Sequence, residues 1–332
     1  MAGFEQSNTS ARAEALAGQG RVSEAFHLLE SAIAAGDGMA ALTLADWRMA
    51  GGLIRRDLGE ARRLYGLAAA LGCDEAAPIH IALLANGAGG SGRRWSEALA
   101  LLGARVPGDP AAAMQIALLT AMALDEAGNP LNAAGRTTIH DNPRIERLPA
   151  FLSADECRYL TDLALPRLAP SVVVDPRTGQ QLRDPVRTGL SAGFPFVSED
   201  PVLHAINRRI AAASASSYEQ GEPLQVLSYE AGQEYKLHSD ALPGEGNQRV
   251  ATVLVWLNDG YAGGATRFPR LELELSGRAG DAMVFGNIDA ARAPHPDMWH
   301  AGLPVRDGRK LLLSKWIRAK PLDLSGPPGR PF

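Results

Sequence analysis

The chain has 332 residues, of which 46% are hydrophobic and 21% charged, and its formal net charge at pH 7 is −4. This length predicts about two domains with a hydrophobic core, and the weak negative charge gives no electrostatic reason to expect a nucleic acid or an anionic membrane as a partner. The sequence MAGFEQSNTSARAEALAGQG has no apolar segment of the signal-peptide kind, and no stretch reaches the apolar length of a membrane helix, so we expect a cytoplasmic protein.

Residues 1–125 are rich in alanine and leucine and contain a pattern that recurs at Gly36, Gly72 and Gly108. Each glycine follows one helix-forming segment (SEAFHLLESAIAAG, GEARRLYGLAAALG or SEALALLGARVPG) and precedes another. Two helices per repeat at this period predict a helical solenoid whose glycines end helices. The segments resemble Sel1-like repeats, relatives of the tetratricopeptide (TPR) repeats. The alternative is an ordinary alanine-rich helical bundle.

The composition changes at residues 126–143, where Gly, Pro and Asn predict a linker. Residues 144–320 are expected to form the second domain, and residues 321–332 a Pro/Gly-rich tail. The two cysteines, Cys73 and Cys157, fall in different expected domains. They argue against a disulfide framework, and we expect both to be buried as small apolar residues.

The second domain begins with two predicted helices and continues with strands. Ser153 followed by Glu156 forms a capping-box pattern before ECRYLTDLAL, and the second helix is DPVLHAINRRIAAASASS. Beyond Glu222, VATVLVWL is apolar on both faces and predicts a central strand, whereas the alternation in LELELS predicts a half-exposed strand. Two helices and about eight strands predict an α+β protein with a double-stranded β-helix, or jelly roll, after the N-terminal solenoid.

The segment QVLSYEAGQEYKLHSD ends in a pair of candidate metal ligands, His238 and Asp240. Because side chains alternate along an extended chain, these two residues point to the same side and can bind one ion. His300 is the preferred third ligand because it lies ten residues before Lys310; His295, in a loop between two prolines, is the rival. Two His and one carboxylate form the facial arrangement of non-haem Fe(II) oxygenases.

The last predicted strand, KLLLSKWIR, carries a cation on the face that points inward. Alternation places the side chains of Lys310, Leu312, Ser314, Trp316 and Arg318 on one face. A lysine inside a barrel is unfavourable unless it meets an anion. An oxo-acid co-substrate supplies that anion if its distal carboxylate pairs with Lys310 and its keto-acid end chelates the metal.

Six segments between about Arg144 and Arg318 together resemble the prolyl 4-hydroxylase type of Fe(II)/2-oxoglutarate dioxygenase. In order, they are LPAFLSADEC, VRTGLSAGF, EPLQVLSYEAGQEYKLHSD, QRVATVLVWLNDGYAGGATRFP, GRAGDAMVFGN and WHAGLPVRDGRKLLLSKWIR. The resemblance implies Fe(II), 2-oxoglutarate and O₂ as cofactors and co-substrates, with ascorbate as an accessory. The implied iron ligands are His238, Asp240 and His300, and the implied 2-oxoglutarate residues are Lys310, Tyr229 and Thr266.

The resemblance also implies a substrate channel, lined by the counterparts of Tyr235, Arg249, Trp316 and Arg318, with Glu222 nearby. One position departs from the family pattern, because Gly189 stands where the family usually has serine. This departure concerns local hydrogen bonding and leaves the metal site unchanged.

The function implied is hydroxylation of a prolyl residue in a peptide or protein, with release of succinate and CO₂, and the helical repeats are expected to help hold the substrate. The short segment ALPGEGNQ after Asp240 leaves open a free amino acid or another small metabolite as substrate. A zinc hydrolase could use the same three ligands but does not explain Lys310. A non-catalytic repeat adaptor is disfavoured because all three ligands and the lysine are present.

Overall fold

The computed structural model describes residues 2–174, 181–183, 186–242 and 244–323, and these residues form two compact units. The helical unit contains the described residues up to Asn129 together with Phe196–Ile206 and Asp323. The sheet unit contains Pro130–Pro195 and Asn207–Leu322. Most of the expected tail, residues 324–332, lies outside the described residues. None of the described helices is long and apolar enough to cross a membrane.

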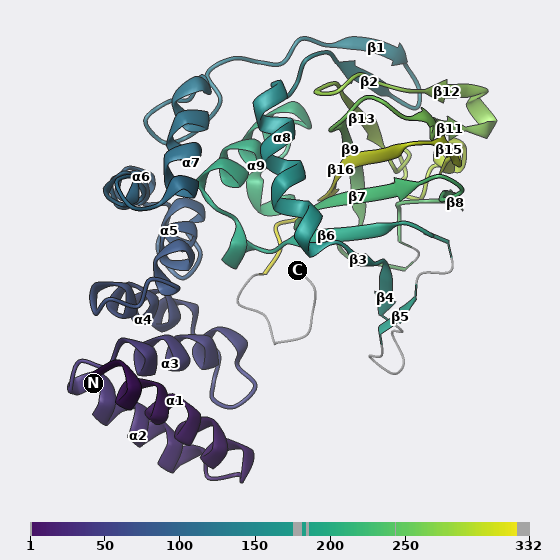
Figure 1. The fold of residues 1–332 in the computed structure, drawn as a ribbon. Helices are drawn as coiled ribbons and strands as arrows, with labels where there is room; N and C mark the ends of the chain where they lie inside the picture. The colour runs from purple at the N-terminus through teal and green to yellow at the C-terminus, as the bar shows by residue number, and fades with distance from the viewer. Residues whose placement is uncertain (1, 175–180, 184–185, 243, 324–332) are drawn as a thin grey trace. The chain divides into compact units, whose positions relative to one another are not determined.

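The helical unit is built from helices that each pack against the next one along the chain (Figure 1). They are α1 (Ala2–Gly18), α2 (Val22–Ala34), α3 (Gly38–Ala50), α4 (Leu58–Ala70), α5 (Ala76–Asn86), α6 (Trp95–Arg105) and α7 (Pro110–Ala121). Gly36 and Gly72 follow α2 and α4 with left-handed φ angles of 91° and 87°, as glycines that end helices do. The prediction of N-terminal helices is confirmed.

Aspartates in the turns begin several of these helices. The Asp37 and Asp109 carboxylates accept hydrogen bonds from the backbone N–H groups of Ala40 (3.0 Å) and Ala111 (2.9 Å), so they cap α3 and α7. These two caps follow Gly36 and Gly108, the corresponding positions of the sequence period. Local capping and glycine conformation therefore explain where these helices start and stop.

Among its described residues, the sheet unit contains two larger antiparallel sheets and two two-stranded pairs. The larger sheet has the order β1 (Thr137–His140), β2 (Ile145–Leu148), β13 (Ala282–Gly286), β9 (Arg249–Trp256), β16 (Arg309–Arg318), β7 (Leu224–Glu230), β6 (Leu190–Phe194) and β3 (Ala169–Pro170). The smaller sheet has the order β12 (Leu273–Leu275), β11 (Thr266–Phe268), β14 (His300–Gly302) and β8 (Tyr235–His238). Two-stranded pairs are formed by β10 (Ala262–Gly263) with β15 (Val305–Asp307) and by β4 (Val172–Val174) with β5 (Gln181–Arg183).

The strands β9 and β12 lie where the sequence predicts them, whereas β1 begins before residue 144, the predicted start of the second domain. β9 is central in the larger sheet, and β12 is partly exposed. β1 lies inside residues 126–143, the range expected to be a linker. It is a strand of the sheet, since Thr138 of β1 pairs with Glu146 of β2. The Gly, Pro and Asn residues around this short β-branched segment favour a linker, so the sequence did not predict a strand here.

Helix α8 (Ala154–Ala164) packs on β6 and β7 and has the expected capping box. Ser153 N donates to Glu156 Oε2 (2.7 Å), and Glu156 N donates to Ser153 Oγ (3.2 Å). Arg209, in the second half of α9 (Pro201–Ala213), forms an ion pair with Glu156 at 2.7 Å. Short 3-10 turns lie at η1 (Leu165–Arg167), η2 (Phe196–Ser198), η3 (Tyr218–Gln220), η4 (Pro269–Leu271) and η5 (Pro296–Met298).

The core of the sheet unit lies between its two sheets. β2, β7, β9, β13 and β16 of the larger sheet and β11 of the smaller one contribute buried side chains to one cluster, which contains Ile145, Leu227, Tyr229, Leu254, Trp256, Phe268, Met283, Phe285, Met298, Val305 and Leu312. The inner faces of the two sheets therefore pack on each other. Cys73 and Cys157 are both buried and free, as expected.

Candidate metal centre

His238, Asp240 and His300 come together at the edge of the smaller sheet. His238 ends β8 and His300 begins β14, and the two residues are direct partners in the antiparallel pairing of these strands. The Nε2 atoms of His238 and His300 each lie 3.6 Å from a different oxygen of Asp240. One ligand atom from each residue lies within 4.8 Å of the others, so the three can bind one metal ion. The structure thus brings together the three ligands that the sequence indicates.

Both histidines are held in the tautomer that binds a metal. His238 Nδ1 lies 2.7 Å from the carbonyl oxygen of Lys236, and His300 Nδ1 lies 3.0 Å from that of Met298. A carbonyl oxygen only accepts hydrogen bonds, so in the neutral form of each ring Nδ1 carries the proton and Nε2 has a lone pair for a metal. The donor set of two imidazoles and one carboxylate fits Fe(II).

The charge state of the three ligands is also suited to a cation. Burial by itself would raise the pKa of Asp240, but the nearby His300 and His238 and the hydrogen bond from Thr252 outweigh it and hold the pKa well below its usual range. Burial lowers the pKa of His300 to about 4, although Asp240 opposes this shift. At neutral pH the site therefore offers a carboxylate and a neutral imidazole.

His295, the rival third ligand, lies apart from this cluster. It precedes η5, and its Nδ1 accepts a hydrogen bond from the backbone N–H of Asp297 at 3.2 Å. The described structure places His300, and not His295, within reach of His238 and Asp240.

A cavity between the two sheets adjoins the candidate ligands. Its lining comes from both sheets and consists of Leu227, Tyr229, Tyr235, His238, Asp240, Leu254, Thr266, His300, Gly302, Leu303, Val305, Lys310, Leu312, Ser314 and Trp316. Four of these residues, Lys310, Leu312, Ser314 and Trp316, alternate along β16 as the sequence predicts. The metal ligands and the lysine therefore line one cavity.

Lys310 is a buried cation in the wall of this cavity. Its side chain is 3% exposed, and Nζ donates a hydrogen bond to the carbonyl oxygen of Gly264 at 2.6 Å. Burial lowers the pKa of Lys310 to about 8. In the described part of the chain no carboxylate pairs with it, so its remaining N–H donors are available to an anion. Tyr229 on β7 is the pairing partner of Lys310, and both Tyr229 and Thr266 line the same cavity.

The residues expected in a substrate channel divide into two groups. The rings of Tyr235 and Trp316 line the cavity, and Tyr235 stacks on His238 with ring centroids 3.6 Å apart and 13° between the planes. Arg249 lies behind the wall, with its guanidinium 3.9 Å from the Trp316 ring centre.

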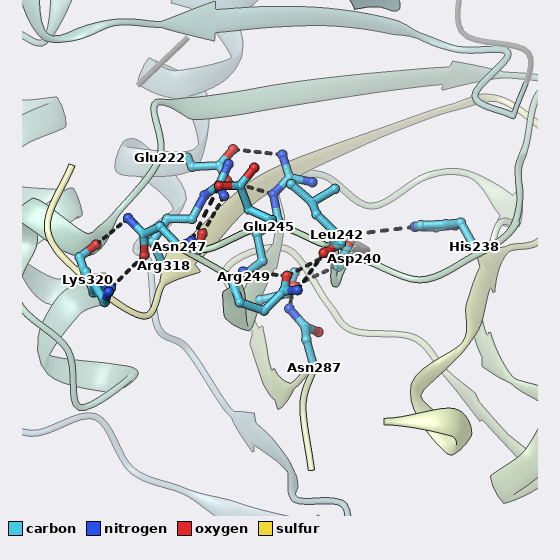
Figure 2. A network of polar contacts seen from close by, with 12 residues as sticks. Glu222, His238, Asp240, Leu242, Glu245, Asn247, Arg249, Asn287, Arg318 and Lys320 are labelled. Carbon is cyan, nitrogen blue, oxygen red and sulfur yellow. Dashed lines mark hydrogen bonds and ion pairs between the residues drawn. The ribbon is translucent and has the colours of Figure 1, made fainter. Parts of the chain in front are cut away.

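Glu222 is the centre of a buried ion-pair network with Arg249 and Arg318 (Figure 2). Its carboxylate accepts hydrogen bonds from Arg249 Nε at 2.6 Å and from Arg318 Nε at 2.5 Å. Arg318 also donates to the carbonyl oxygen of Asn247 at 2.6 Å. Glu222, Arg249 and Arg318 support the cavity wall but are not among the residues that line it.

Two residues that contact the site were not anticipated. The Thr252 hydroxyl donates to Asp240 Oδ2 at 2.6 Å, and Asn287 Nδ2 donates to Thr252 Oγ1 at 2.9 Å. Thr252 is the polar residue within the otherwise apolar VATVLVWL, which is a sequence signal for a buried hydrogen bond. Asn287 carries no comparable signal.

The structure also explains the glycine at position 189. A Cβ atom there would lie 2.5 Å from the carbonyl oxygen of Ser228 and 2.7 Å from the ring of Tyr229. Any side chain at this position would displace a ring that lines the cavity, so the backbone approach requires glycine.

Residues 224–318 match the model of the 2OG-Fe(II) oxygenase superfamily. Prolyl 4-hydroxylase 1 of Arabidopsis thaliana is 37% identical over 198 residues, which cover 54% of this chain and 70% of that protein. The chain belongs to the prolyl 4-hydroxylase family. Probable prolyl 4-hydroxylase 10 of the same plant is 34% identical over 200 residues, covering 53% and 69% of the two chains. It follows that the protein is an oxidoreductase, a dioxygenase that uses Fe(II), 2-oxoglutarate and O₂.

The chain is also similar to a solved structure, the 2OG complex of the viral collagen prolyl hydroxylase vCPH from Paramecium Bursaria Chlorella virus-1. The two sequences are 28% identical, the alignment covers 53% of this chain and 96% of the viral one, and the TM-score is 0.43.

Proposed function

We propose that the protein hydroxylates a prolyl residue of a peptide or protein, with Fe(II) bound by His238, Asp240 and His300 and with 2-oxoglutarate bound at Lys310. The observation that carries this proposal is one cavity that presents both a His-Asp-His cluster and a buried lysine with no carboxylate partner in the described residues. When bound, Fe(II) and 2-oxoglutarate supply the oxidising chemistry, in which decarboxylation to succinate and CO₂ accompanies hydroxylation of a C–H bond.

The chain itself binds and orients the co-substrate. The Lys310 ammonium pairs with the distal carboxylate of 2-oxoglutarate, and the Thr266 and Tyr229 hydroxyls supply further polar contacts in the same cavity. Leu227, Leu254 and other apolar side chains of the lining keep water away from the reacting groups. This arrangement is not explained by a zinc hydrolase, which needs no buried lysine.

The substrate proposal depends on the aromatic residues of the lining. Tyr235 and Trp316 offer faces on which a proline ring can stack. Arg249, stacked on Trp316 and held by Glu222, keeps that indole in place. Relatives at 34–37% identity carry the name prolyl 4-hydroxylase, which supports a prolyl residue as the target.

For the architecture, we propose that residues 1–125 form Sel1/TPR-like repeats and that residues 144–320, extended by β1, form a double-stranded β-helix. Helix-by-helix packing and the equivalent caps at Asp37 and Asp109 support the first assignment. Two facing antiparallel sheets support the second. A stacked helical surface suits a protein or peptide substrate.

A small metabolite is the second candidate substrate, and the segment after Asp240 favours it. The Gln248 side chain bonds both the N–H (2.7 Å) and the carbonyl oxygen (2.6 Å) of Leu242, which ties Leu242 to the end of this segment. Mass spectrometry for a 16 Da gain on prolyl peptides and on free amino acids, with Fe(II) and 2-oxoglutarate added or withheld, separates the two. Modification of a free amino acid but of no peptide would overturn the prolyl-peptide assignment.

A further inference from the structure

Two buried side chains outside the candidate ligand set connect Asp240 to the larger sheet. Thr252 on β9 is 1% exposed and Asn287, just after β13, is 2% exposed. Figure 2 shows Asn287 pointing toward Asp240. Thr252 Oγ1 lies 2.6 Å from Asp240 Oδ2, and Asn287 Nδ2 lies 2.9 Å from Thr252 Oγ1. Neither residue lines the cavity, so neither serves to contact a substrate.

The chemistry of these groups fixes the direction of the hydrogen bonds. A hydroxyl has one hydrogen to donate, and an ionised carboxylate only accepts. Because the Asn287 amide donates to Thr252, the Thr252 hydrogen is left for Asp240. The backbone holds the asparagine in place, since Asn287 N donates to Val250 O and His295 N donates to Asn287 O, both at 2.9 Å.

We infer that Thr252 and Asn287 form a relay that, by holding Oδ2, fixes the orientation in which the Asp240 carboxylate would bind the metal. This inference rests on the proposed metal site. Without the relay the carboxylate could rotate away from the orientation in which it would bind the ion, and the metal would then be held more weakly. Thr252 and Asn287 are positioning residues, not ligands.

The test is direct binding of Mn(II) to the full-length protein without 2-oxoglutarate, followed by electron paramagnetic resonance. Thr252→Val keeps the shape of the side chain and removes the hydroxyl, whereas Thr252→Ser keeps the hydroxyl. Loss of a residue that orients a metal ligand lowers metal affinity about 10- to 100-fold. We expect Thr252→Val to bind Mn(II) at least tenfold more weakly and Thr252→Ser to bind within about threefold of the parent, a rescue that a packing role would not predict. Affinity of Thr252→Val within twofold of the parent would overturn the relay.

Asn287→Leu provides a second, independent arm, because it leaves Thr252 in place. It should also weaken Mn(II) binding, and the double variant Thr252→Val/Asn287→Leu should bind no more weakly than Thr252→Val alone, because Asn287 acts through Thr252. Additive losses would show that the two residues do not form one relay. If Thr252→Val folds poorly, unchanged binding by Asn287→Leu still overturns the inference.

Asp240→Ala separates failure of the relay from failure of the proposed metal site. If Asp240→Ala binds Mn(II) like the parent, the metal assignment itself is wrong. If Asp240→Ala loses Mn(II) and Thr252→Val retains it, only the relay is wrong. Absorption of the Co(II)-loaded protein adds a signature, since a change in the orientation of a carboxylate ligand should alter the ligand field in Thr252→Val and leave it unaltered in Thr252→Ser.

Discussion

His238 and His300 are direct partners across the antiparallel strands β8 and β14, and their ring centroids lie 4.3 Å apart. This pairing brings two histidines that are distant in the sequence next to Asp240. The neighbouring His295 precedes η5 and lies outside this cluster.

The first prediction follows from this pairing. Replacing His238, Asp240 or His300 with Ala should abolish turnover of 2-oxoglutarate and weaken Mn(II) binding by more than a hundredfold, because each change removes one of three ligands. His295→Ala is the matched control and should retain activity. Calorimetric Mn(II) titration and succinate formation measure both effects. Loss of activity in His295→Ala with retention in His300→Ala would reverse the assignment.

The second prediction concerns the distal carboxylate of 2-oxoglutarate. Lys310→Ala leaves that carboxylate unpaired in the cavity, which should cost about 2–5 kcal/mol of binding free energy. The apparent KM for 2-oxoglutarate should therefore rise at least tenfold, while Mn(II) affinity stays near that of the parent. An unchanged KM would remove Lys310 from the co-substrate site.

The third prediction is a pH dependence. Because burial lowers the pKa of Lys310 to about 8 in the ligand-free protein, the free cavity holds a neutral amine at higher pH. Binding of 2-oxoglutarate must then take up a proton, so its apparent KM should increase above pH 8. Lys310→Arg stays charged throughout this range and should show a flatter profile. Equal profiles for the two proteins would argue against titration of Lys310.

The lowered pKa of Lys310 also predicts how the stability of the folded protein changes with pH. The folded pKa of about 8 lies below the ordinary value of 10.5, so the unfolded chain binds more protons between these two pH values. The contribution of Lys310 to the free energy of unfolding therefore becomes more favourable as the pH rises through this window. Urea unfolding of the ligand-free parent and of Lys310→Met across the window measures the difference.

The fourth prediction separates a buried ion pair from an exposed one. Glu222 is 7% exposed and holds both Arg249 and Arg318. Glu222→Gln should lower the free energy of unfolding by about 3 kcal/mol, because it leaves buried guanidinium groups without their carboxylate. Glu230→Gln breaks the exposed pair with Arg309 and should change stability by less than about 1 kcal/mol. Equal losses in urea unfolding would contradict the proposed importance of burial.

The fifth prediction tests the helical repeats. Deleting residues 1–125 should strongly reduce hydroxylation of a protein substrate, because the surface proposed to hold it is removed. The rate of uncoupled 2-oxoglutarate decarboxylation should stay near that of the parent. This activity also serves as the control that the remaining domain is folded. A truncated protein that hydroxylates its substrate as fast as the full chain would remove the repeats from substrate binding.

The parts of the site that depend on local periodicity could be predicted from the amino-acid sequence. The two-residue spacing of His238 and Asp240 and the alternation from Lys310 to Trp316 fix which side chains share a face, and the structure has both. The capping box before α8 and the helix-ending glycines are equally local. These features follow from the geometry of a few consecutive residues, so one sequence is enough to predict them.

Which strands are neighbours, and which side chains support those that line the cavity, could be seen only in the folded protein. Pairing of β8 with β14 selects His300 over His295, and pairing of β1 with β2 adds a strand to what the sequence presents as a linker. The Thr252–Asn287 contact depends on the neighbouring positions of β9 and β13 in the larger sheet. Strand pairing is set by burial and hydrogen bonding between segments far apart in the chain, and the spacing of residues along one segment does not contain that information.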